Sequence, residues 1–305
     1  MIKLQSALCV LMAGLALAAC DRGAKANPVQ AVASVTEQAG QGEPYLVAGT
    51  QVWNVPDPVS GRNYQVYVAL PPSYEEQPQR AYPVLYVTDA HYAFPLIRQF
   101  ARRMNLEGPV IQEHILVGLS YAEGDSGPVS RTRDYTPSAR EGRPAGAEGG
   151  GPPYQTYLKS EVLPFIEQRF RADPQQRIML GHSFGGLLGA QIMFSEPELF
   201  SAYVLGSPSL WFDNKRMFDV EARYAADHTD LKASVFMYVG EGEHPAPTNS
   251  NRYDMVADNR LFEQRLRSRS YPGLTLRSIV VDGEDHLTVA PIGFMRALEA
   301  VLPAK

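Results

Sequence analysis

Short, almost uninterrupted apolar runs recur along the chain, separated by longer mixed stretches. Such runs are typical of strands buried on both faces of a sheet, and they occupy residues 84–88 and 115–119. Further strands are expected at residues 177–180, 202–205, 234–239 and 275–281. Ahead of them, residues 51–55 and 64–70 are rich in β-formers and flank a segment of Pro, Asp, Ser and Gly. That pattern predicts an antiparallel hairpin.

The mixed stretches carry apolar residues at helical spacing. The clearest stripe lies within residues 154–170, at Leu158, Val162, Phe165, Ile166 and Phe170. We expect further helices at residues 95–104, 186–194, 259–268 and 292–301. A hairpin followed by alternating strands and helices predicts an α/β fold, with a mostly parallel central sheet, an N-terminal antiparallel hairpin and helices on both faces.

Residues 121–153 interrupt this alternation. The stretch is dense in Gly, Pro, Ser and Arg, and a loop of this length in a compact domain is usually a lid, a binding loop or disordered. It follows the C-terminal end of a predicted strand, which is the ligand side of such a sheet. Within it, Gly149–Gly151 precede two prolines and are expected to form a flexible linker.

The first residues have the features of an export signal. Lys3 precedes an apolar run at 7–19 that is too short to remain as a membrane-spanning helix. The tetrapeptide Leu17–Cys20 resembles the bacterial lipobox, in which cleavage before the cysteine leaves a lipidated N-terminus. An ordinary secretion signal with a coincidental cysteine is the alternative.

The lipobox resemblance implies an organisation into three parts. Residues 1–19 are a lipoprotein signal peptide, residues 20–44 are the lipidated N-terminus and a flexible tether, and residues 45–305 are a single folded domain. The chain is then an exported bacterial lipoprotein that faces the periplasm and is anchored to a membrane through Cys20.

Composition narrows the possible partners. The formal charge of the whole chain is −5, and removal of residues 1–19 takes away only Lys3, which leaves −6. This mild acidity argues against nucleic acid. The other cysteine, Cys9, lies in the predicted signal, so the mature chain has no internal disulfide and no cysteine-based metal site. Without an H-E-x-x-H motif or a compact ligand cluster, we expect no metal and no cofactor.

The pentapeptide Gly181–Gly185 has the form G-x-S-x-G and lies between a predicted strand and a predicted helix. In that context, the pattern is typical of a nucleophile elbow, a strained turn that exposes a serine above the sheet. Ser183 is therefore the candidate nucleophile, and it needs a base within hydrogen-bond reach.

His286 is the candidate base because it lies in a polar loop after the last predicted strand, which fits the chain order of serine, acid, histidine. The acid is expected after strand 234–239, where Glu243 stands three residues past Gly240 and is favoured over Glu241. The fallback acids Asp282 and Glu284, or a dyad without an acid, remain open. His182, next to the nucleophile, is expected to pack against its neighbours or to support the catalytic residues from an outer position.

Acyl transfer through such a serine would also need donors for the oxyanion of the tetrahedral intermediate. The backbone N–H of Phe184, directly after the nucleophile, is one candidate. The second is expected from the turn after strand 84–88, at the N–H of Ala90.

Taken together, these motifs resemble the putative-esterase branch of the α/β hydrolases, which includes siderophore trilactone esterases, S-formylglutathione hydrolase and mycolyltransferases. The likeness is greatest to the siderophore esterases and runs from about residue 52 to 301. It is carried by Val87–Asp89, Arg133–Pro137, Leu163–Glu167, Gly181–Gly186, Ser207–Trp211 and Gly283–His286. One departure is Asp89–Ala90, where many relatives have Asp-Gly.

The resemblance implies an α/β-hydrolase fold and a serine esterase that acts on a small-molecule ester, such as the cyclic trilactone of a ferric siderophore. Guanidinium groups suit anionic, planar catecholates, and the long loop holds Arg131, Arg133, Arg140 and Arg143. Tyr135 and Trp211 are expected to stack on the aromatic rings. The alternatives are a general carboxylesterase, an acyltransferase, or a non-catalytic binding lipoprotein of the same fold.

Overall fold

The computed structural model describes residues 45–246 and 252–304. The predicted signal peptide, Cys20 and the predicted tether lie outside these residues. Contacts divide the chain into a unit of residues 1–48, of which only 45–48 are described, and a unit of residues 49–305 that carries the fold. Within the described residues, no helix is both long and apolar enough to cross a membrane.

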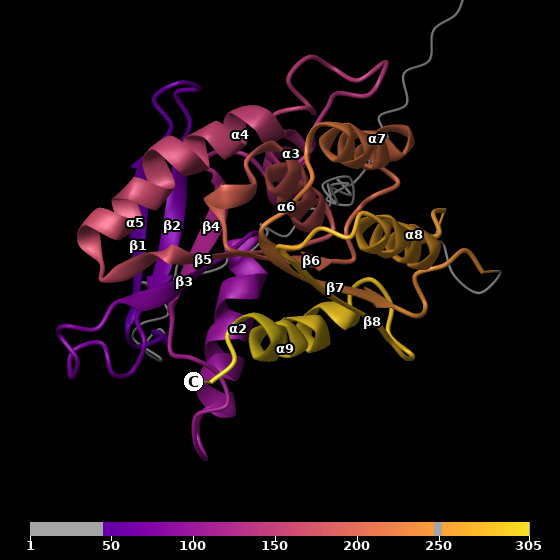
Figure 1. Cartoon of the computed structure of the whole chain (residues 1–305). Coiled ribbons are helices and arrows are strands. Elements are labelled where there is room, and N and C mark those ends of the chain that lie inside the picture. The colour runs from indigo at the N-terminus through magenta and orange to yellow at the C-terminus, as the bar shows by residue number, and fades with distance from the viewer. Residues whose placement is uncertain (1–44, 247–251, 305) are drawn as a thin grey trace, which may run out of the picture. The chain divides into compact units, whose positions relative to one another are not determined.

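The second unit is built on an eight-stranded sheet with the order β1-β2-β4-β3-β5-β6-β7-β8 (Figure 1). Strand β2 pairs antiparallel with both β1 and β4, and the other neighbours are parallel. The strands span Thr50–Pro56 (β1), Asn63–Ala69 (β2), Tyr82–Val87 (β3), Ile115–Ala122 (β4), Ala172–His182 (β5), Ala202–Gly206 (β6), Ala233–Gly240 (β7) and Leu274–Val281 (β8). The predicted α/β-hydrolase fold, with its N-terminal hairpin and mostly parallel sheet, is confirmed.

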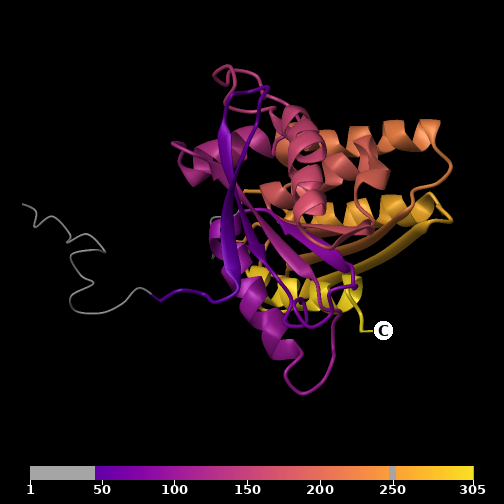
Figure 2. The same ribbon diagram turned by 90° about the vertical axis from the view of Figure 1, so that its left-hand side faces the viewer.

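Helices cover both faces of this sheet (Figures 1 and 2). One face packs against α2 (Ala90–Met104) and α9 (Val289–Val301) through a core that includes Phe94, Ile97 and Phe294. The other face packs against a second set of helices: α4 (Gly151–Tyr157), η1 (Leu158–Val162), α5 (Leu163–Arg169), α6 (Phe184–Ser195), α7 (Phe212–Asp227) and α8 (Met255–Ser268). The apolar stripe predicted for residues 154–170 lies in that second core, because Leu158, Val162 and Ile166 are buried there.

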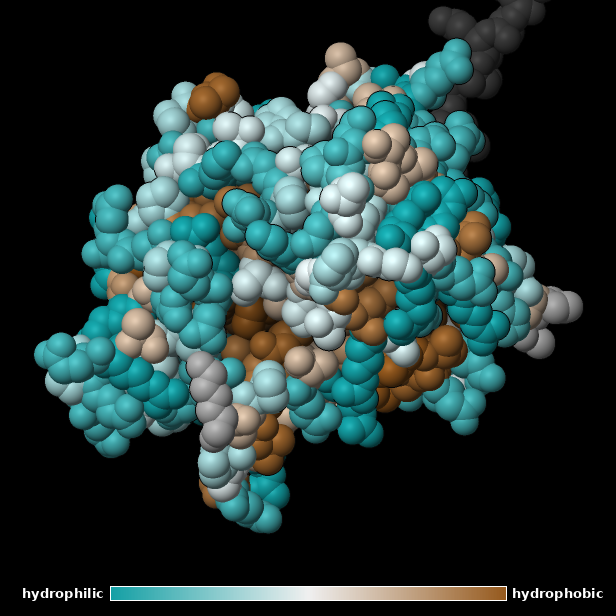
Figure 3. Space-filling view, viewed as in Figure 1, coloured by the Kyte–Doolittle hydropathy of each residue, from teal (hydrophilic) through white to brown (hydrophobic). Residues whose placement is uncertain are grey.

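The outer surface contrasts with these two cores. In the space-filling view, hydrophilic residues cover most of the visible face, and apolar residues show mainly in the recesses between them (Figure 3). The short helix η2 (Pro197–Leu199) completes the connection from α6 to β6.

Residues 121–153 are not a plain loop. They contain a helix, α3 (Gly127–Asp134). The predicted flexible linker at Gly149–Gly151 is wrong, because its backbone is hydrogen-bonded: Gly149 N–H donates to Thr136 Oγ1 at 2.8 Å, and Gly151 N–H donates to the Thr136 carbonyl at 2.9 Å. All five predicted helical segments begin later than the observed helices, which start at Ala90, Gly151, Phe184, Met255 and Val289.

Candidate active site

Ser183 lies in a sharp turn between β5 and α6. Its backbone angles are φ 60° and ψ −119°, a conformation that non-glycine residues rarely adopt and that is concentrated at functional sites. A Cβ at position 181 would overlap the backbone of Gly185, and a Cβ at position 185 would overlap the Thr88 hydroxyl. Glycine at both positions therefore lets strand, turn and helix approach closely enough to form the elbow.

The segment after β6 contacts this elbow directly. Ser183 N–H donates to the Gly206 carbonyl at 2.8 Å, and Ser209 N–H donates to the Ser183 carbonyl at 3.2 Å. The Ser209 hydroxyl, which is buried, lies 3.4 Å from Ser183 Oγ. The sequence suggests no role for Ser209 beyond its place in the motif Ser207–Trp211.

His286 lies in the loop between β8 and α9, and its Nδ1 is 2.6 Å from Glu243 Oε2. The Glu243 side chain is only 1% exposed, and its other oxygen accepts hydrogen bonds from Ser207 Oγ at 2.5 Å and Gly240 N–H at 2.8 Å. Glu241 is exposed and instead accepts from the Gly283 N–H at 3.1 Å. Of the carboxylates considered from the sequence, Glu243 is the one in contact with His286 Nδ1.

His182 links the elbow to the loop that carries His286. Its Nε2 is 2.9 Å from the His286 carbonyl, and its Nδ1 is 3.2 Å from the Tyr238 hydroxyl. Burial, with a smaller contribution from His286, lowers the pKa of His182 to about 3. The ring is therefore neutral, with Nε2 donating to the carbonyl and Nδ1 accepting from Tyr238. This arrangement fits the outer role expected from the sequence.

The two candidate oxyanion donors both stand at helix N-termini. Phe184 is the first residue of α6 and Ala90 the first residue of α2. Backbone N–H groups in the first turn have no acceptor within their own helix, and the helix dipole favours a negative charge there. Because the Thr88 side chain packs on Gly185, the end of β3 that leads into α2 lies beside the start of α6.

An ion pair supports the residue before Ala90. The Asp89 carboxylate is buried and accepts from Arg131 Nε at 2.9 Å, from Arg131 Nη2 at 3.2 Å and from the Tyr121 hydroxyl at 2.6 Å. The Arg131 guanidinium also lies over the Phe184 ring, 5.3 Å from its centroid. Burial acts against the charged form of Arg131, but Asp89 outweighs it and raises the pKa of the guanidinium. Arg131 is thus part of the site, with a partner that the sequence did not reveal.

Arg133 and Tyr135 are both buried among protein groups, so the prediction that they bind substrate is wrong. Arg133 is buried and forms ion pairs with Asp134 at 2.8 Å and Asp125 at 2.6 Å, so its charge is balanced by carboxylates of the protein. Tyr135 is 1% exposed and packs on Tyr154, which leaves no free ring face for a ligand. The remaining loop arginines, Arg140 and Arg143, both pair with Glu148.

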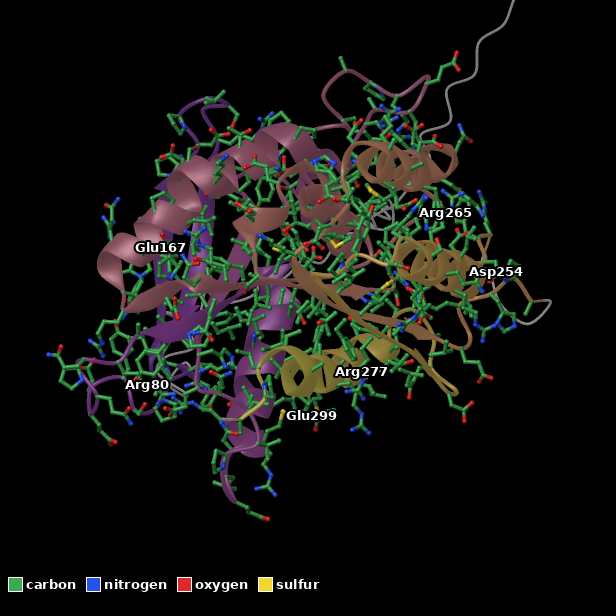
Figure 4. All side chains as sticks on the ribbon, viewed as in Figure 1. Arg80, Glu167, Asp254, Arg265, Arg277 and Glu299 are labelled. Carbon is green, nitrogen blue, oxygen red and sulfur yellow. The ribbon has the colours of Figure 1, made fainter. Side chains whose placement is uncertain are left out.

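Trp211 stands in a series of aromatic rings that begins beside the nucleophile. Its ring is 6.0 Å from that of Phe184 and stacks on Tyr253 at 4.0 Å with an interplanar angle of 3°. Tyr253, which is 42% exposed, was missed in the sequence. It immediately precedes Asp254, the N-cap residue of α8 that is labelled in Figure 4. The series runs from the elbow to the surface.

Comparison with known proteins shows the family to which the chain is similar. The model of the Esterase family, described as "Putative esterase", matches residues 58–277. The ferri-bacillibactin esterase BesA of Bacillus subtilis is 24% identical over 279 residues, which cover 86% of this chain and 93% of that protein. These matches confirm the resemblance to siderophore esterases inferred from the motifs.

Solved structures agree with the fold. The BES protein from Bacillus cereus superposes with a TM-score of 0.74 at 25% identity, over 86% of this chain and 98% of its own. An IroE-like serine hydrolase from Shewanella oneidensis has a TM-score of 0.71 at 24% identity, over 82% of this chain and 79% of its own.

Proposed function

The chain belongs to the Esterase family and is a carboxylic ester hydrolase, and from that premise we propose that it works through an acyl-enzyme on Ser183. The observation that carries the proposal is the 2.6 Å contact between His286 Nδ1 and a buried Glu243, in a fold that places Ser183 on a strained elbow. Nucleophile (Ser183), acid (Glu243) and base (His286) follow one another in the chain in the order typical of α/β hydrolases.

In the proposed reaction, His286 Nε2 takes the hydroxyl proton of Ser183 while Ser183 Oγ attacks the ester carbonyl carbon. Glu243 holds the imidazole by its Nδ1–H and stabilises the imidazolium that forms. The same proton then passes to the leaving alcohol. Water attacks the acyl-enzyme in the second half, with His286 again as base, and releases the acid product.

The oxyanion of each tetrahedral intermediate is proposed to accept hydrogen bonds from the N–H groups of Phe184 and Ala90. Preorganised donors of this kind account for a large share of catalysis in acyl transfer, and loss of one costs about a hundred- to a thousandfold in rate. The Asp89–Arg131 pair is proposed to keep the turn that bears Ala90 in place.

For the substrate, we propose a siderophore trilactone with planar aromatic arms. The similarity to ferri-bacillibactin esterase supports this class. So do the ring series Phe184–Trp211–Tyr253, on which a catecholate ring can stack, and the Arg131 guanidinium beside it. Arg133 and Tyr135 take no part in this proposal.

The proposal is tested by incubating the full-length chain with a ferric trilactone siderophore and with a short-chain nitrophenyl ester, and identifying the products by mass. A Ser183→Ala variant is the control. Linearised siderophore that disappears with Ser183→Ala is the expected result. Cleavage of the nitrophenyl ester alone would keep the serine esterase and discard the siderophore. A new ester formed with an added alcohol would indicate acyl transfer instead.

We also propose that the enzyme is an exported lipoprotein, anchored to a bacterial membrane through Cys20 and facing the periplasm. The support is the sequence Leu17–Cys20 after an apolar run.

A further inference from the structure

The segment Gly206–Ser209, which follows β6, contacts both the nucleophile and the acid. At its two ends, the Gly206 carbonyl accepts from Ser183 N–H, and Ser209 N–H donates to the Ser183 carbonyl. Between those ends, Ser207 Oγ donates to Glu243 Oε1 at 2.5 Å. This short segment therefore joins the elbow to the carboxylate that faces His286.

Ser207 is held in an unfavourable conformation to make this contact. Its φ is 36°, in the left-handed region, and its side chain is fully buried. Its N–H donates to the Tyr238 carbonyl at 2.7 Å, which fixes the backbone against β7. Strain of this kind persists only where the surrounding structure enforces it, and it is concentrated at functional sites.

Glu243 depends on such donors because its carboxylate is buried. A carboxylate taken out of water needs hydrogen bonds or an opposite charge to keep its own charge. Ser207 Oγ and Gly240 N–H both donate to Oε1, which leaves Oε2 directed at His286 Nδ1. With the Ser207 hydroxyl removed, Oε1 would keep only the Gly240 donor, and the carboxylate could rotate away from His286.

We propose that Ser207 is a positioning residue that acts through Glu243: its hydroxyl stabilises the carboxylate charge and fixes its orientation toward His286. The inference rests on the proposed function, since it gives Ser207 a role only if Glu243 is the acid of the reaction. Ser207 itself touches no reacting atom.

The first test is Ser207→Ala in the full-length chain. Alanine tolerates this backbone conformation no better and no worse than serine, so the change removes the hydroxyl alone. Loss of a hydrogen bond to a charged group predicts a fall in kcat of roughly tenfold to a hundredfold. KM for a short-chain nitrophenyl ester is expected to stay the same. Ser207→Cys, which keeps a weak donor, is expected to recover part of kcat.

Ser73→Ala is the matched control. Ser73 is also buried and its hydroxyl also donates to a carboxylate, that of Glu113, but it precedes β3 and so lies at the opposite end of the sheet from Ser183. This variant is expected to keep the wild-type kcat. An equal loss of kcat in both variants would assign the effect to general destabilisation and overturn the proposal.

The second test combines Ser207→Ala with Glu243→Gln. If Ser207 acts through the carboxylate, its effect on kcat disappears in the Glu243→Gln background, because residues acting as a unit are not additive. Additive losses would contradict this. The downfield NMR signal of the His286 Nδ1–H is a second readout, expected to shift or broaden in Ser207→Ala but not in Ser73→Ala.

The role of Glu243 as the acid and the role of Ser207 as its positioning residue can be disproved separately. A Glu243→Gln variant with wild-type kcat would remove the acid from the proposed mechanism, and Ser207 with it. A Glu243→Gln variant with impaired kcat, alongside a fully active Ser207→Ala, would leave the mechanism in place and overturn the role of Ser207 alone.

Discussion

The elbow at Ser183 depends on a residue that carries no side chain. At position 181, any Cβ would meet the carbonyl carbon and oxygen of Gly185 and the nitrogen of Gly186, all of them backbone atoms that cannot turn aside. At position 189 in α6, an added Cβ would meet only the end of the Leu205 side chain, at 2.9 Å. Gly181 therefore avoids a clash with the backbone of α6, whereas Gly189 avoids only a contact with a side chain that can move.

We predict that Gly181→Ala destabilises the protein by about 1–3 kcal/mol through overpacking and abolishes most of the esterase activity, because α6 must move away from β5. Urea unfolding and kcat/KM for a nitrophenyl ester measure the two effects. Gly189→Ala is the control and is expected to stay near the wild type in activity. A fully active Gly181→Ala would show that the elbow tolerates a wider turn than its geometry implies.

Two buried histidines make stability depend on pH. Burial is the main cause that lowers the pKa of His182 to about 3 and also lowers that of His114. In the unfolded chain both return to about 6.5. The unfolded state therefore binds more protons between these values, and the free energy of unfolding falls as the pH drops below about 6.5. Above that pH, the contribution of both residues is fully present.

We predict that His182→Gln reduces this dependence. Its removal should lower the slope of unfolding free energy against pH by up to about 1.4 kcal/mol per pH unit, measured by urea unfolding between pH 6.5 and 5, above the range in which most carboxylates titrate. His114→Gln is a matched comparison that removes the other contribution. A slope unchanged by His182→Gln would mean that the ring is not held neutral.

At the level of single residues, the sequence was informative where a motif prescribes chemistry. Ser183, His286 and Glu243 stand at positions that the pattern of the fold singles out, and the structure places Glu243 against His286. Ser207 and Tyr253 could not be found in the same way. Their roles depend on which side chain lies across from them, and neither a serine before a proline nor a tyrosine before a helix carries that information.

Among the elements, the helix α3 carries two arginines, Arg131 and Arg133, whose side chains lie in different surroundings. Arg131 faces the site, whereas Arg133 is directed into a buried cluster with Asp134, Ser130 and Tyr64. Both were expected to bind substrate, because both lie in an arginine-rich stretch. Side chains two positions apart on a helix point in different directions, so a cluster in sequence is not a cluster in space.

We predict that Arg133→Ala costs about 3–5 kcal/mol of stability, because it leaves the buried Asp134 carboxylate without its cation. KM for a nitrophenyl ester is expected to remain unchanged. The control is Arg143→Ala, after which Glu148 keeps its pair with Arg140 and the loss should be smaller. Urea unfolding and steady-state kinetics separate the two effects. A raised KM with unaltered stability would indicate that Arg133 binds the substrate.

Elements that are buried on both sides were predictable from apolar runs alone, and every predicted strand is present in the sheet. The helices α3 and α7 were not predicted, for different physical reasons. The sequence of α3 begins Gly-Pro and has little apolar periodicity. The start of α7 contains Asp213, Asn214 and Lys215 in left-handed conformations, with Asp213 hydrogen-bonded to Ser138. Tertiary contacts, rather than local preference, decide both.

For the molecule as a whole, the proposed anchor and the catalytic unit are separate in sequence. The family match covers residues 58–277, and Cys20 precedes it by a segment rich in Ala, Gln, Gly and Glu. A single acyl chain binds a membrane only marginally, whereas two or more hold stably. The multiple acylation of a bacterial lipoprotein would therefore keep the enzyme at the membrane.

We predict that Cys20→Ser moves the protein from the membrane pellet to the supernatant after cell fractionation, because it removes the acceptor of the acyl chains. Activity per molecule toward a nitrophenyl ester should not change, since the site is built from residues far along the chain. Cys9→Ser is the matched control, for it alters the other cysteine inside the predicted signal and should leave the chain anchored. A Cys20→Ser protein that still pellets would require a different attachment, and a Cys9→Ser protein that does not pellet would show that the apolar run, not the lipid, holds the chain.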